Sequence, residues 1–171
     1  MPRASHRLNL LLVPADPERR PDPLLAGQLF AALRAEAVTD AWDRPGPRAE
    51  ALHAGGFALF RADFPPEPVI YGNRQGGYRA VCPACGASVV AAVLQALKRW
   101  RASGDMGLRC ERCGVPCSLS TVIYQPDAAP ARFALELRDV ERPIFSPSAQ
   151  VMELLERTLG QGFRCIASRG P

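Results

Sequence analysis

Hydrophobic positions in the first third of the chain follow a strand, helix, strand order. The apolar run Leu8–Val13 is typical of a buried strand. Asp22 and Pro23 then favour the start of a helix, because aspartate caps free N–H groups and the fixed φ of proline suits the first turn. Apolar residues recur at helical spacing within 24–38, at Leu25, Leu29, Ala32 and Leu33. After a loop rich in proline, glycine and arginine, residues 56–62 form the next predicted strand, which the following prolines end.

The same order returns near the C-terminus. Apolar side chains alternate with other residues at Phe133, Leu135 and Leu137, a period of two that predicts a half-buried strand. Ser146-Pro147 then favours a helix start, and Gly160 is placed to end that helix. The apolar stripe of the helix comprises Val151, Leu154, Leu155, Thr158 and Leu159. The segment Phe163–Ser168 is a predicted closing strand.

Two strand–helix–strand units in one chain predict the α+β class. Their order resembles the split β-α-β, or ferredoxin-like, sandwich, which implies four antiparallel strands with two helices on one face. The sandwich would be built from residues 1–68 and 121–171, and residues 69–120 would form an insert between its two halves.

The insert has its own hydrophobic pattern. Turn-forming residues Gly72-Asn73 and Gly76-Gly77 lie between two short apolar runs and predict a β-hairpin that leads to Cys82. A helix that ends near Ser103-Gly104 is predicted next, because apolar residues recur at three- and four-residue spacing. These residues are Val89, Val90, Val93, Leu94, Leu97 and Trp100.

Cysteines flank this predicted helix in two copies of one motif. The first copy is C-P-A-C-G at Cys82–Gly86, and the second is C-E-R-C-G at Cys110–Gly114. A structural zinc ion takes four soft ligands in a tetrahedron, and each C-x-x-C turn supplies two thiolates. The sequence therefore predicts one zinc site formed by Cys82, Cys85, Cys110 and Cys113.

Three alternatives stay open for the cysteines. A proline inside C-x-x-C is also typical of thiol-redox pairs, so the protein could use Cys82 and Cys85 for redox chemistry. Four thiolates also suit iron or an iron–sulfur cluster. Cys117 follows Cys113 by four residues and either replaces a ligand or stays free. The simplest interpretation of Cys117 and Cys165 is a small buried hydrophobic residue.

The two cysteine motifs resemble the paired knuckles of zinc-ribbon proteins. That family holds one zinc ion with four cysteines and serves as a docking or nucleic-acid-binding module, which implies the same for Cys82–Gly114. Most ribbons place strands between the knuckles, whereas this sequence has a helix-like stretch there.

Charge is concentrated in the insert. The chain of 171 residues has a net charge of +4, and segment 69–120 alone carries seven basic against two acidic residues. The seven are Arg74, Arg79, Lys98, Arg99, Arg101, Arg109 and Arg112. With Tyr71, Tyr78 and Trp100 among them, they are candidates for a binding surface. A protein partner is favoured over nucleic acid, and the basic charge of the insert would suit an acidic one.

Features of an enzyme or of a membrane protein are missing from the sequence. The two histidines, His6 and His53, lie outside any catalytic motif, and an all-cysteine ligand set favours a closed structural zinc site. No apolar stretch approaches the roughly 18 residues of a membrane helix. The run at Leu8–Val13 is too short and interrupted to be a secretory signal. We therefore expect a non-enzymatic, cytoplasmic binding or adaptor protein of undetermined oligomeric state.

Overall fold

A four-stranded antiparallel sheet forms the body of the protein in this computed structural model, which describes residues 8–72, 77–160 and 162–169. Its strands are β1 (Leu8–Val13), β2 (Leu59–Asp63), β9 (Ala134–Val140) and β10 (Arg164–Arg169). They lie in the order β10-β1-β9-β2, and each neighbouring pair is antiparallel. The predicted α+β class is confirmed.

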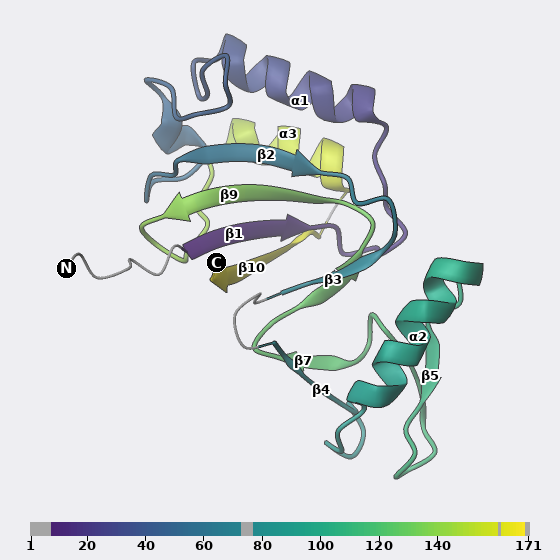
Figure 1. The fold of residues 1–171 in the computed structure, drawn as a ribbon. Helices are drawn as coiled ribbons and strands as arrows, with labels where there is room; N and C mark the ends of the chain where they lie inside the picture. Colours follow the sequence, from purple (N-terminus) through teal and green to yellow (C-terminus); the bar gives the residue numbers. More distant parts are fainter. Residues whose placement is uncertain (1–7, 73–76, 161, 170–171) are drawn as a thin grey trace, which may run out of the picture.

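Two helices cover one face of this sheet, as Figure 1 shows. Helix α1 (Pro23–Ala35) begins where the sequence predicts, because the Oδ1 atom of Asp22 accepts a hydrogen bond from the N–H of Leu24 at 2.8 Å. Helix α3 (Ala149–Leu159) is capped by Ser148, two residues after the predicted start, and Gly160 ends it. A short 3₁₀ helix, η1 (Ala49–Ala51), interrupts the loop between α1 and β2.

The main hydrophobic core lies between the helices and the sheet. Leu10, Leu12 and Leu135 extend from the central strands into a cluster that both helices complete. The helix residues in it are Leu29, Phe30, Leu33, Val151, Leu155 and Leu159. The apolar stripes predicted from sequence include these residues except Phe30, which the predicted stripe of the first helix did not contain.

The opposite face of the sheet is also partly covered. Strands β3 (Val69–Tyr71) and β8 (Ala129–Ala131) pair with each other and pack against Leu11, Val13, Ala134 and Ile166. Strand β9 is therefore buried on both faces, and its predicted half-buried character is wrong. Its Ala134 and Glu136 side chains are covered, although their positions in the alternating pattern predicted exposure.

The predicted hairpin within 69–81 is wrong as well. Strand β3 pairs with β8, and β4 (Arg79–Val81) pairs with β7 (Ile123–Gln125), so the outgoing chain pairs with the returning chain. Residues 73–76 of the predicted turn lie outside the described residues. Turn-forming residues favour a reversal of the chain, but they do not determine which strands pair with each other.

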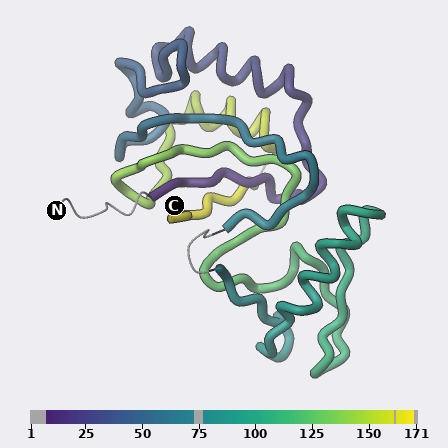
Figure 2. The backbone as a smooth tube through the Cα atoms, viewed as in Figure 1, coloured from purple at the N-terminus to yellow at the C-terminus, as the bar shows by residue number. Residues whose placement is uncertain are grey.

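The chain between β3 and β8 forms a separate module, which lies to one side of the body (Figure 2). It contains α2 (Val90–Ser103) and a strand pair, β5 (Gly107–Arg109) with β6 (Pro116–Ser118). A second hydrophobic cluster supports it, made of Ala80, Cys82, Val89, Val93, Ala96, Trp100, Leu108, Cys110, Leu119, Val122, Tyr124 and Ala128. We call this region, residues 79–128, the module.

Candidate metal centre

The four predicted cysteine ligands lie together in the module. The Sγ atoms of Cys82, Cys85, Cys110 and Cys113 are all within 4.8 Å of one another. The distance from Cys82 to Cys113 is 3.8 Å, and that from Cys85 to Cys110 is 3.7 Å. A tetrahedron with metal–sulfur bonds of about 2.3 Å has sulfur–sulfur edges of about 3.8 Å. The arrangement thus has the size that a tetrahedral metal ion requires.

Both cysteine pairs sit on the same kind of turn. In the first turn the N–H of Gly86 donates to the carbonyl of Cys82 at 2.9 Å, and the N–H of Cys82 donates to Ala87. In the second, Gly114 donates to Cys110 at 2.8 Å, and Cys110 donates to the carbonyl five residues later. The φ angles of the two glycines are 67° and 72°, in the left-handed region that favours glycine. The shared C-x-x-C-G pattern therefore forms two similar turns, and each turn supplies two of the four sulfurs.

Backbone N–H groups of these turns face the sulfurs. Those of Ala84 and Cys85 lower the pKa of the Cys82 thiol from 9.0 to about 6. The N–H of Cys113 likewise lowers the pKa of Cys110. Such N–H groups stabilise a thiolate, the form of cysteine that binds metal, and they orient its lone pairs.

Helix α2 packs in the same hydrophobic cluster as Cys82 and Cys110, one ligand from each turn. Its preceding residue, Val89, donates from its N–H to the carbonyl of Ala80 at 2.8 Å and anchors the helix on β4. Val93, Ala96 and Trp100 form its buried face. The predicted apolar stripe was too wide, because Leu94 is 51% exposed and Val90 is 36% exposed.

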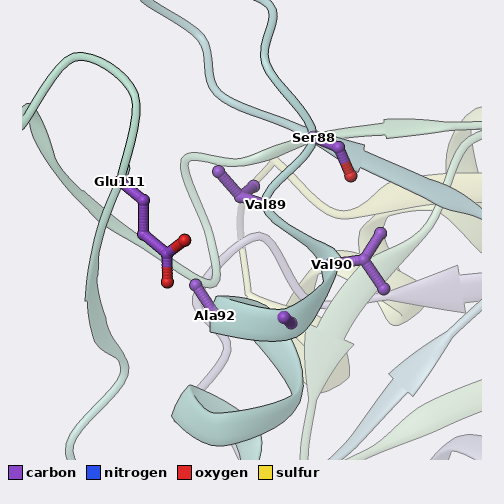
Figure 3. A pocket seen from close by; sticks show the side chains of 6 residues that line it. Ser88, Val89, Val90, Ala92 and Glu111 are labelled. Carbon is purple, nitrogen blue, oxygen red and sulfur yellow. The ribbon is translucent and has the colours of Figure 1, made fainter.

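A small hollow lies at the start of α2, with a volume of about 110 Å³. Figure 3 shows Glu111, from the second cysteine turn, across this hollow from Val89 and Ala92. Glu111 lies near the N-terminal end of a helix whose cap makes no side-chain hydrogen bond, and a carboxylate is favourable at that end.

The remaining cysteines are not among the four clustered sulfurs, but Cys117 lies close to them: burial and a side-chain contact with Cys82 raise the pKa of its thiol. Cys117 lies on β6 opposite Leu108, and its Sγ is 3.7 Å from the carbonyl of Val115. Cys165 is half-buried in β10, and burial raises the pKa of its thiol to about 11. All six cysteines are free thiols in this structure, and Cys117, like Cys165, is half-buried.

The seven basic residues of the predicted binding surface differ in their contacts. Arg99 pairs with Asp105 at 3.0 Å and donates to the carbonyl of Gly107, and Arg101 pairs with Glu67 at 3.4 Å. Arg109 donates to the carbonyl of Gly114 at 2.6 Å and braces the second cysteine turn. Arg79, Lys98 and Arg112 are exposed, and their side chains make no hydrogen bond or ion pair to any described residue. Arg74 lies outside the described residues.

One contact between the module and the body was missed from the sequence. The indole N–H of Trp100, at the buried end of α2, donates to Glu18 in the loop after β1. Arg132 pairs with the same carboxylate at 2.9 Å and lies 5.3 Å from the centre of the Trp100 ring. These residues are 32 or more positions apart in the sequence, so no local pattern identifies their contact.

Comparisons with known proteins add no homologue. No protein-family model, no curated protein and no solved structure matches this chain. The likeness to zinc-ribbon knuckles therefore rests on the two motifs and on their geometry. Among the described residues, no helix is both long and apolar enough to cross a membrane.

Proposed function

We propose that Cys82, Cys85, Cys110 and Cys113 bind one zinc ion and that the protein is a zinc-stabilised binding or adaptor protein. The observation that carries this proposal is the clustering of the four sulfurs within 4.8 Å. Four thiolates in a closed tetrahedron leave no position for a substrate, which favours a structural site over a catalytic one. We accordingly propose no enzymatic activity. Iron in the same ligand set is the alternative metal.

The zinc ion would hold the module, which contains most of the insert predicted over residues 69–120, in its folded shape. The hydrophobic cluster of the module includes Cys82 and Cys110 themselves, so its packing depends on the position of these ligands. A core of this size supplies little stability without a metal or a disulfide. Metal binding and folding of the insert would therefore be coupled.

The folded insert would present a basic surface to a partner. Arg79, Lys98 and Arg112 support this proposal, because they are exposed and unpaired among the described residues. We propose an acidic protein partner ahead of a nucleic acid. The size of the salt effect separates the two: each contact to a nucleic-acid phosphate releases a counterion and steepens the fall of affinity with salt, whereas ion pairs with protein carboxylates are screened without that release.

The body would serve as the scaffold of this insert. We propose the ferredoxin-like arrangement for residues 1–68 and 121–171, supported by the strand order and by two helices on one face of the sheet. We also propose that Cys82–Gly114 is similar to a zinc ribbon, because its two cysteine turns have matching hydrogen bonds. A cytoplasmic location remains a prediction from the sequence.

A thiol-redox function is the second candidate, using Cys82 and Cys85. It is favoured by one observation, the lowered pKa of Cys82, because a thiolate is the reactive form of cysteine. In this function the second cysteine pair would have no role.

The metal content of two variants separates these candidates. Cys82→Ser should lower bound zinc from one ion per chain toward none, whereas Cys165→Ser, which removes a thiol on β10 of the body, should retain it. The zinc proposal is abandoned if Cys82→Ser keeps its metal, or if the wild-type protein purified under reducing conditions contains none. The redox candidate predicts an unchanged fold in Cys82→Ser and loss of reactivity toward a disulfide substrate.

A further inference from the structure

Two arginines share one buried carboxylate on the sheet face opposite the helices. Glu136 lies on β9 directly opposite Arg61 of β2, and its side chain is 5% exposed. The Oε2 atom of Glu136 accepts hydrogen bonds from the Nε atoms of Arg61 at 2.6 Å and Arg138 at 3.1 Å. Asn9 donates to the other oxygen at 3.4 Å. The carboxylate thus fixes two guanidinium groups side by side.

This arrangement leaves a positive charge and free donors at the surface. Both arginines use Nε for Glu136, and their terminal Nη groups make no hydrogen bond to any described residue. Their side chains remain 38% and 37% exposed. Two cations held against one anion repel each other, and a second anion would relieve that repulsion. Guanidinium groups bind carboxylate and phosphate oxygens in a bidentate manner.

A hollow of about 320 Å³ lies on the same face of the sheet, and its lining includes Leu11 and Asp63 but neither arginine. Leu11, Val69 and Ile70 give it apolar walls, and Asp63 lies at its border with its Oδ2 accepting from the hydroxyl of Tyr71 at 3.0 Å. Leu11 is the direct neighbour of Glu136 across the β1–β9 pair. The alternation of a strand places Asp63 on the same face as Arg61, two residues away. The hollow therefore lies next to Glu136 on one face of the sheet, and Arg61 is the nearer of the two arginines to it.

We propose that this face binds a small molecule with an oxyanion headgroup on an apolar body. The headgroup, a phosphomonoester or a carboxylate, binds the Nη groups of Arg61 and Arg138. The apolar body lies in the hollow against Leu11 and Val69. Asp63 repels an anion, so the headgroup lies at the arginine end. This site is distinct from the cysteine cluster and does not depend on zinc.

Calorimetric titration of the full-length protein with four probes tests the proposal. Phenyl phosphate and benzoate carry both parts of the ligand, inorganic phosphate carries the headgroup alone, and phenol carries the ring alone. At low salt we expect saturable binding of one phenyl phosphate or one benzoate per chain, several-fold tighter than inorganic phosphate and phenol. The tighter of the two compounds identifies the headgroup. The proposal is overturned if neither compound binds at concentrations up to 10 mM, an order-of-magnitude limit for weak specific binding.

Variants show where the probe binds. Arg61→Gln and Arg138→Gln should each weaken binding about tenfold, as expected for the loss of a charge-assisted bidentate contact. Arg48→Gln is the matched control, because Arg48 is an exposed arginine paired with Glu36 elsewhere. Val69→Phe, which fills the hollow, should weaken phenyl phosphate but not inorganic phosphate. Circular dichroism identifies any variant that fails to fold, and Arg61→Lys, which keeps the charge, then replaces it and should weaken binding less than tenfold. An equal loss in Arg48→Gln would overturn the proposal.

Discussion

Removal of the proposed zinc ion should unfold the module and leave the four-stranded sheet folded. A structural zinc site contributes about 10–16 kcal/mol to folding in small zinc-binding peptides. A single small core rarely supplies more than about 3–5 kcal/mol, so the module should not remain folded without its metal. The larger core between sheet and helices contains none of the four ligands and should stay intact.

The size of the expected signal follows from the fold. Helix α2 supplies 14 residues, against 13 in α1 and 11 in α3, so over a third of the α-helical circular dichroism should disappear. Of the two tryptophans, Trp100 is fully buried in the module, whereas Trp42 is 75% exposed. The emission maximum should therefore move to longer wavelength because of Trp100 alone.

The assay is a titration with a chelator under reducing conditions, followed by addition of zinc to restore both signals. Cys165→Ser should respond as the wild type does, because Cys165 lies on β10 of the body and is not among the four clustered cysteines. If the metal-free protein keeps its full helical signal and its short-wavelength emission, the coupling of metal binding to folding is refuted.

Three further predictions concern stability, measured by chemical denaturation. Glu18→Ala should cost about 1–3 kcal/mol, because it leaves the buried indole N–H of Trp100 without its acceptor. Burial lowers the pKa of His53 below its ordinary value of 6.5, so protonation favours the unfolded chain. Stability should fall as the pH drops below about 6.5, and His53→Gln should flatten that dependence; an unchanged pH profile would contradict this. Gly86→Ala should cost about 1 kcal/mol from its φ of 67° alone, since no atom lies within 4 Å of the added methyl group. Gly27→Ala, in the open interior of α1, should instead stabilise the protein by about 0.5–1 kcal/mol, and the same sign for both glycines would refute the argument.

Local sequence patterns predicted the parts of the structure that local physics determines. Asp22 caps α1 because its side chain reaches the N–H two residues ahead, and this needs no tertiary contact. The two C-x-x-C-G motifs likewise form their turns from hydrogen bonds within five residues. Their meeting in one cluster followed from ligand chemistry, since four thiolates suit one tetrahedral ion.

Long-range pairing could not be predicted in this way. Gly72 and its neighbours indicated a hairpin, yet β3 and β4 pair with strands more than 40 residues away. The second face of β9 is buried by β3 and β8, which the alternating pattern of β9 alone does not reveal. Glu136 was not singled out either, because the sequence does not show that Arg61, 75 positions away, lies opposite it.

X-ray absorption at the zinc edge of the purified protein tests the central claim most directly, because it reports the ligands of the bound metal. Convergence of Cys82, Cys85, Cys110 and Cys113 predicts four sulfur ligands at about 2.3 Å around one zinc ion per chain. A shell containing nitrogen or oxygen, or fewer than four sulfurs, would contradict the closed four-thiolate centre.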